Sequence, residues 1–284
     1  MSYFLSLLEY ILFWIFIKLL KFFKFPTKIF LSSKVISFIL RNSSKYRKRV
    51  FNNLKLIYPK MSDIEKKKFL YKFSKNLGLT FSEFLFNEEY HKYQQIKLQS
   101  YTQIMEILEA ININRPVLIV SGHIGPWEAV RALLKRNGIE TAAIYRKSSN
   151  IFYQPYHHKA IEAGGKPIFQ VGRKGTTAMI KYLKQGGVVC MMIDQAVSEG
   201  KYINFMGYPA KTSFAIADIA IKYNALIVPA YAVRKVEKKI VEVSIEPSIP
   251  LSKPTIIMRQ LNKSLENIVK KYPSQWYWVH NRWK

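Results

Sequence analysis

From Pro116 onward, short runs of apolar and β-branched residues alternate with segments of helical periodicity. This alternation predicts an α/β fold, with a central, mostly parallel sheet flanked by helices on both faces. The runs are apolar almost throughout, which is typical of strands buried on both faces of a sheet. The predicted strands cover residues 117–121, 141–145, 167–171, 188–194, 226–233 and 240–246. The predicted helices cover residues 126–137, 151–163, 174–185, 212–223 and 255–271.

Two helical segments precede this region. Residues 33–58 are helical in pattern and basic, and Pro59 ends the segment because proline disfavours helix in the residue before it. Ser62 and Glu65 have the spacing of a capping box and predict a second helix that runs to about Phe86. The sequence contains no Gly/Ser linker and no internal repeat, so we expect residues 31–284 to form one α/β domain.

The N-terminal residues 3–25 are apolar and aromatic, interrupted by Glu9 and by lysines. The lysines recur at steps of three, three and four, on one face of a helix: Lys18, Lys21, Lys24 and Lys28. This stripe favours a helix that lies in the membrane interface with its lysines toward lipid phosphates. A spanning helix over residues 3–20 is the alternative, and the lysines after it would place the rest of the chain in the cytoplasm. A core helix is the third interpretation, and we expect residues 1–30 to form a membrane anchor.

The chain carries 45 Lys and Arg against 18 Asp and Glu, a net charge of +27, which implies an anionic partner. Nucleic acid, an anionic bilayer and an acidic protein all fit the charge, but no helix-turn-helix, RNP-like or zinc-finger pattern supports nucleic acid. The single cysteine, Cys190, lies in an apolar run and predicts core packing. It also excludes a disulfide framework, and the five histidines show no metal-binding spacing, so no metal is expected.

The stretch from Val117 to Glu128 carries the candidate chemistry. An apolar strand runs into a Gly-containing turn, which places His123 at the carboxyl end of the strand, where open α/β sheets bind ligands. Gly125 is predicted as the N-cap of the next helix and Pro126 as its first residue, which puts the Glu128 carboxylate in the first turn. A carboxylate that holds one imidazole nitrogen leaves the other free to accept a proton from a hydroxyl. A loop histidine with a capping glutamate is the alternative interpretation.

The same residues carry a family resemblance. His123 and Glu128 resemble the H-x4-D/E motif of glycerolipid acyltransferases, and the flanking blocks are similar to the late acyltransferases of lipid A biosynthesis, the lauroyl/myristoyl transferases. Those blocks are residues 53–62 (NLKLIYPKMS), 145–150 (YRKSSN), 194–195 (DQ), 205–210 (FMGYPA) and 275–284 (QWYWVHNRWK). No G-x-S-x-G nucleophile elbow is present, which favours direct attack by a hydroxyl over a covalent acyl-enzyme.

The resemblance implies transfer of a fatty acyl chain from acyl-acyl carrier protein to a hydroxyl of a lipid A precursor, without metal or other cofactor. It makes His123 the general base and Glu128 its orienting partner. It also implies a catalytic domain on the cytoplasmic face of the inner membrane. The candidate substrate-binding residues are Arg146, Asn150, Lys166, Arg173, Asp194 and Gln195.

Among those candidates, a cation is expected to stabilise the thioester oxyanion or to hold a substrate phosphate: Arg146, Lys166 or Arg173. Asp194 and Gln195 are expected to line the cleft beside His123. The sequence departs from the family at Gly164-Gly165-Lys166, where R-G-R is common, and it lacks the F-P-E-G-T-R-S-like block of glycerol-phosphate acyltransferases. The alternatives are an acyltransferase with another glycolipid or phospholipid acceptor, a non-enzymatic basic membrane or nucleic-acid-binding protein, and an inactive membrane scaffold.

Overall fold

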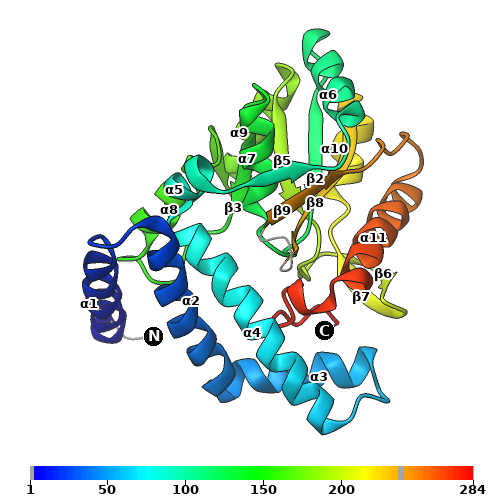
Figure 1. Ribbon diagram of the computed structural model, residues 1–284. Helices are drawn as coiled ribbons and strands as arrows, with labels where there is room; N and C mark the ends of the chain where they lie inside the picture. The colour runs from blue at the N-terminus through cyan, green and yellow to red at the C-terminus, as the bar shows by residue number, and fades with distance from the viewer. Residues whose placement is uncertain (1–2, 236–239, 284) are drawn as a thin grey trace.

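A seven-stranded sheet forms the centre of the molecule (Figure 1). The computed structural model describes residues 3–235 and 240–283. The strands lie in the order β1 (Ile96–Leu98), β9 (Ile240–Ile245), β8 (Leu226–Lys235), β2 (Val117–Ser121), β5 (Val188–Met192), β3 (Ala142–Tyr145) and β4 (Ile168–Gln170). β8, β2, β5, β3 and β4 are parallel to one another, whereas β9 runs antiparallel to β8 and carries β1 at the edge. The predicted α/β fold with a mostly parallel sheet is therefore confirmed.

Helices cover both faces of the sheet, because alternate strand residues point to opposite sides. One face of β2 packs its Leu118 and Val120 against a core that contains α9 (Arg173–Lys184), α10 (Ala215–Tyr223) and α11 (Pro254–Lys271). The other face packs Val117 and Ile119 against α6 (Thr102–Asn112) and α7 (Glu128–Arg136). Cys190 belongs to this second core, where burial raises the pKa of its thiol to about 12, so the thiol packs as an apolar group.

The N-terminal helices pack beside the sheet (Figure 1). They are α1 (Tyr3–Leu20), α2 (Phe25–Asn42), α3 (Ser44–Ile57), α4 (Asp63–Leu85) and α5 (Asn87–Tyr93). Both α4 and α5 contact α8 (Gln154–Ala163), the helix between β3 and β4. The predicted capping box at Ser62 and Glu65 is confirmed, with both of its hydrogen bonds present. The predicted helix over residues 33–58 is instead two helices that meet at Ser43, and residue 30, the expected end of the anchor, falls inside α2.

The predicted lysine stripe is wrong, because α1 ends at Leu20, shortly after Lys18, and the chain turns before α2 begins at Phe25. Lys28 lies on the buried side of α2 and forms an ion pair with Glu89 of α5, with 2.6 Å between Nζ and Oε1. Two helices, rather than one, thus carry the lysines.

The α2 helix turns its polar side inward. Ser32, Ser33 and Ser37 are buried against α4, and the Ser37 hydroxyl donates to the carbonyl of Ser74 at 2.8 Å. The two helices approach so closely that a Cβ on Gly78 would lie 2.4 Å from Ser37 Oγ. The outward side is apolar and exposed: Phe30, Val35, Phe38 and Ile39. This arrangement inverts the pattern of a helix on a water-soluble protein.

A hairpin and the C-terminal residues complete the fold. β6 (Lys201–Phe205) and β7 (Tyr208–Thr212) pair antiparallel around a turn in which Met206 and Gly207 both have positive φ. A short helix, η1 (Pro273–Gln275), leads into residues 276–283, which lie between α4 and the hairpin (Figure 1). Asn53 of α3 donates to the carbonyls of Trp278 and His280, so the N-terminal helices hold this segment in place.

Candidate active site

His123 lies on a tight turn after β2, as its position in the sequence predicts. The backbone of Gly125 has φ of +52°, and a Cβ at this position would come within 2.3 Å of the Ala232 carbonyl oxygen of β8. The N–H of Gly125 donates to the carbonyl of Gln275 at 2.9 Å, and Ile124 forms an antiparallel bridge with Trp276. The turn is therefore fixed from both sides, by β8 and by the C-terminal segment.

The partner of the His123 side chain is Asp194, which follows β5, the strand paired with β2. Imidazole Nδ1 lies 2.7 Å from Asp194 Oδ1, and the backbone N–H of His123 donates to Oδ2, also at 2.7 Å. Burial raises the pKa of the Asp194 carboxyl, but the adjacent His123 and the N–H donors outweigh burial and lower that pKa to about 2. Asp194 is therefore ionised at neutral pH.

An ionised carboxylate only accepts hydrogen bonds, so in the neutral imidazole of His123 the proton is on Nδ1 and Nε2 presents its lone pair. Within the described residues, no hydrogen bond engages Nε2. The side chain is 21% exposed and lies between the rings of Trp127 and Tyr277, with centroid distances of 5.3 and 5.7 Å. Nε2 is thus the atom of this pair that is available to a reacting hydroxyl.

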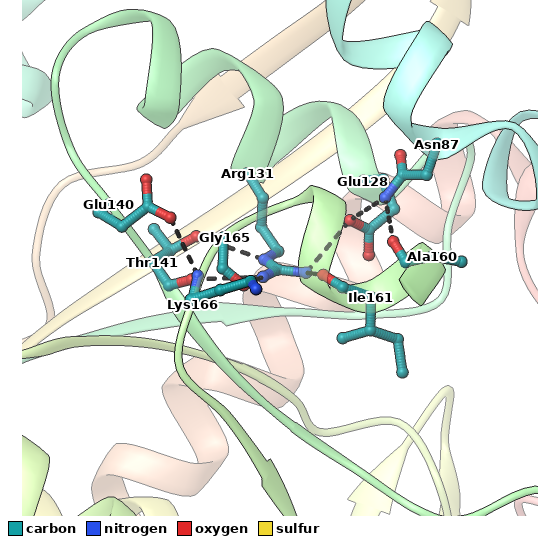
Figure 2. Close-up of polar contacts among 9 residues, drawn as sticks. All are labelled: Asn87, Glu128, Arg131, Glu140, Thr141, Ala160, Ile161, Gly165 and Lys166. Carbon is teal, nitrogen blue, oxygen red and sulfur yellow. Dashed lines mark hydrogen bonds and ion pairs between the residues drawn. The ribbon is translucent and has the colours of Figure 1, made fainter. Parts of the chain in front are cut away.

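Glu128 does not pair with His123, which corrects the expected His-Glu contact. Its carboxylate accepts hydrogen bonds from Asn87 Nδ2 at 3.1 Å and from Arg131 Nη1 at 3.3 Å (Figure 2). The physical reason is the helix start, because α7 begins at Glu128 itself rather than at Pro126. Glu128 is consequently the first helical residue and points toward α5 and α8 instead of back toward the turn.

Arg131 is the centre of this buried network, with a side chain that is 4% exposed (Figure 2). Besides Glu128, the guanidinium donates to the carbonyls of Ile161, Gly165 and Thr141 at 2.9, 3.0 and 3.3 Å, and to the Thr141 hydroxyl at 3.3 Å. The network therefore ties the start of α7 to the end of α8 and the start of β3.

Position 164 has no room for a side chain. A Cβ on Gly164 would lie 2.5 Å from Arg131 Nη1 and 2.6 Å from Glu128 Oε2. Glycine at position 164 thus leaves room for the side chain of Arg131 of α7, which fills the space beside the Glu128 carboxylate.

A family model described as bacterial lipid A biosynthesis acyltransferase matches residues 2–284. The chain belongs to this family. It is also similar to Lipid A biosynthesis acyltransferase 2 of Shigella flexneri, with 24% identity over 257 residues, which cover 87% of this chain and 80% of that protein. The protein is accordingly an acyltransferase of lipid A biosynthesis.

In this lipid A acyltransferase the three candidate cations lie apart from His123. Lys166 precedes β4 and so lies at the amino edge of the sheet, opposite His123, where its amine pairs with Glu162 at 3.5 Å. Of the three cations considered for the oxyanion or a substrate phosphate, Lys166 is therefore the one on the opposite edge of the sheet from His123. Arg146 and Arg173 follow β3 and β4 at the carboxyl edge, and both are exposed. At a strand spacing of about 4.8 Å, their strands lie about 10 and 14 Å from β2.

Of the other candidate residues, Asn150 has a structural role, whereas Asp194 and Gln195 lie at the carboxyl edge with His123. Asn150 donates to the carbonyl of Ser6 at 2.9 Å and accepts from the N–H groups of Phe152 and Tyr153, so its amide holds α1 against the loop after β3. Gln195 is exposed beside Asp194 at the carboxyl edge. Asp194 lies beside His123, but it is buried and its carboxylate is committed to His123 rather than to substrate.

The residue that sequence reasoning missed is Trp276. Its indole N–H donates to Asp194 Oδ2 at 2.9 Å, and the side chain is 1% exposed. The motif QWYWVHNRWK identifies this segment, but it does not indicate which of the aromatic rings in it reaches the site. Only the position of η1 against the His123 turn reveals that contact.

An apolar cavity of about 390 Å³ lies between α1, α2, α4 and the loop after β3. Its lining is mostly aromatic and aliphatic: Glu9, Tyr10, Phe13, Ile36, Phe81, Phe84, Leu85, Asn150 and Tyr153. Phe81 packs edge-on against Trp127 and Tyr277, the two rings that flank His123, at 6.0 and 6.1 Å. A larger cavity of about 820 Å³ is lined by charged groups that include Lys24, Glu83 and Glu89, and is less suited to an acyl chain.

No cluster of His, Cys, Asp or Glu in residues 3–235 and 240–283 has the arrangement of a metal site. The site combines an imidazole and its buried carboxylate with an apolar cavity whose wall, through Phe81, contacts the rings that flank the imidazole. Such a set can abstract a proton and hold a hydrocarbon chain.

Proposed function

We propose that the protein transfers a fatty acyl chain from acyl-acyl carrier protein to a hydroxyl of a lipid A precursor, with His123 as general base. The observation that carries this proposal is the His123–Asp194 pair, in which Nδ1 faces the carboxylate and Nε2 is left as the proton acceptor of a side chain that is 21% exposed. Family membership supplies the lipid A precursor, and the net charge of +27 suits an acidic carrier protein.

In the proposed reaction the acceptor hydroxyl gives its proton to Nε2 of His123 as its oxygen attacks the thioester carbonyl carbon. The tetrahedral intermediate then breaks its C–S bond, and the leaving thiolate takes the proton back from the imidazolium. Asp194 stabilises the imidazolium and keeps its ring in place. The products are an ester on the acceptor and the free thiol of the carrier protein.

The apolar cavity beside Phe81 provides a place for the acyl chain. The rings of Phe81, Trp127 and Tyr277 connect its wall to the imidazole. A chain that lies in the cavity would hold its carbonyl carbon near Nε2. This assignment deepens the proposed reaction and depends on it.

The reaction is tested with purified protein, an acyl-acyl carrier protein and a tetra-acylated lipid A precursor, with the product identified by mass spectrometry. We expect transfer by the wild type and a loss on the order of 10³-fold or more in kcat for His123→Ala, because the base is removed. His158→Ala, at a half-exposed histidine of α8, is the matched control and should retain activity. Equal activity of wild type and His123→Ala would overturn the mechanism, and transfer only to another lipid would change the acceptor.

The protein is further proposed to sit on the cytoplasmic leaflet of the inner membrane through α1 and α2. α1 is the one described helix that is long and apolar enough to cross a membrane, and most of its residues face outward. α2 adds exposed apolar residues of its own, among them Phe30 and Phe38, and Lys18, Lys21 and Lys34 are also exposed. An apolar surface with lysines at its border fits an anionic bilayer.

A double substitution on α2 tests this placement. We expect Phe30→Glu with Phe38→Glu to lower binding to anionic vesicles by about tenfold or more, since each charged residue replaces exposed apolar area in the interface. Flotation with vesicles measures the binding. Ile113→Glu is the matched control, because Ile113 is exposed and caps α6, a helix that lies far from α1 and α2 (Figure 1). Unchanged flotation of the double variant would contradict a role for α2.

A further inference from the structure

The Asp194 carboxylate has a third hydrogen-bonding partner, in addition to the side chain and the backbone N–H of His123. Oδ1 contacts the imidazole, whereas Oδ2 accepts both the His123 backbone N–H and the Trp276 indole N–H, at 2.7 and 2.9 Å. With both donors in place, the carboxylate is fixed in rotation, and Oδ1 points at Nδ1.

We propose that Trp276 is a positioning residue that sets the proton affinity of His123 by donating its indole N–H to Asp194. The inference rests on the proposed role of His123 as general base. Its physical basis is competition, because an oxygen that accepts a second N–H holds less negative charge for the imidazolium. The indole thereby keeps Nε2 of His123 unprotonated, and active as a base, to lower pH.

The surroundings of Trp276 prevent the donor from moving away. The indole packs against Phe205, Trp278 and Trp283 with centroid distances of 5.5, 5.0 and 5.8 Å. Its backbone bridges to Ile124, the neighbour of His123. Trp276 thus contacts the His123 turn through its main chain and the Asp194 carboxylate through its side chain.

Two other tryptophans provide matched controls. Trp278 and Trp283 belong to the same cluster, and each donates its indole N–H to a backbone carbonyl, that of Pro273 at 2.6 Å and that of Phe205 at 3.0 Å. A Trp→Phe substitution at any of the three removes one ring and one N–H bond. Only the substitution at Trp276 takes a donor from Asp194.

Other titratable groups near Asp194 are unchanged in these variants. They are Tyr231 of β8 and, in the C-terminal segment, Tyr277, His280 and Arg282. Burial raises the pKa of Tyr277 to about 12 and lowers that of Arg282 to about 10, so neither titrates between pH 5 and pH 8, a range set by the ordinary pKa of histidine. His280 accepts from the N–H of Ala196 through Nε2 and has its own resonances, which separates it from His123.

The first experiment is the pH dependence of kcat/KM for Trp276→Phe, Trp278→Phe and Trp283→Phe. In Trp276→Phe we expect the acid limb to move up by roughly 0.5 to 1 pH unit and kcat to fall about tenfold, the size expected for one hydrogen bond to a charged group. The two controls should keep the acid limb of the wild type. An unmoved limb in Trp276→Phe, or an equal movement in the controls, would overturn the proposal.

A second readout does not depend on the substrate. NMR titration of isotope-labelled histidine reports the imidazole of His123 directly, and its pKa should rise in Trp276→Phe alone. If Trp276→Phe does not fold, benzothienylalanine at position 276 keeps the bicyclic shape and lacks the N–H donor. Absence of acyl transfer in the wild type would contradict the proposed function. A His123 titration in Trp276→Phe equal to that of the wild type would contradict the role of Trp276.

Discussion

Asp194→Asn is expected to lower kcat by about 10³- to 10⁴-fold while the protein remains folded. An asparagine oxygen can still accept from the N–H groups that Oδ2 serves, but its NH₂ then faces Nδ1 of His123. An NH₂ donor requires an unprotonated Nδ1, which places the imidazole proton on Nε2, the atom that must accept a proton from substrate. Steady-state kinetics with the carrier-protein donor measure the loss.

Glu128→Gln is the matched comparison, because both variants replace one buried carboxylate by its amide. The Glu128 carboxylate contacts Asn87 and Arg131 rather than His123, so its amide variant should lower the free energy of unfolding, and activity should fall with the folded fraction. Should Glu128→Gln lower kcat as far as Asp194→Asn with unchanged stability, Glu128 would be acting in the reaction and the assignment of Asp194 would be wrong.

Arg131→Gln is expected to destabilise the protein by about 3–5 kcal/mol, because it leaves the Glu128 carboxylate buried without its cation. It also removes donors to the carbonyls of Ile161, Gly165 and Thr141. Denaturant unfolding in detergent measures the change through the midpoint at constant slope.

Lys135→Gln, on the exposed side of the same helix, is the control for Arg131→Gln and should change stability by less than about 0.5 kcal/mol. The double variant Glu128→Gln with Arg131→Gln should recover part of the loss, since no charge is then left unpaired. Additive losses in the double variant would show that the two side chains are not coupled.

The sheet could be predicted from the sequence because its strands are apolar on both faces. β2 has the predicted bounds, and β3, β4, β5, β8 and β9 lie within two residues of theirs. β1 was not predicted, since three residues carry too little periodicity. The β6–β7 hairpin was also missed, although the Met206-Gly207 turn between two short runs is a hairpin signal.

The partner of His123 could not be derived from local spacing. The H-x4-E pattern suggests that His123 and Glu128 meet, but a positive φ at Gly125 and a helix that begins at Glu128 turn the glutamate away. Asp194 is 71 residues distant and becomes a neighbour only through the pairing of β2 with β5. Parallel pairing of these strands predicted a shared cleft; it could not predict which carboxylate would be buried.

The parts of the site come from distant stretches of the chain, and this has a consequence for biosynthesis. His123 is held by Asp194, and both are held by Trp276, which Asn53 helps to position through its bonds to Trp278 and His280. If α1 binds a membrane as proposed, a nascent chain would do so long before His123 acquires its partners. We therefore expect a chain that lacks residues 275–280 to be inert toward lipid substrates, because Trp276 is then missing from the site.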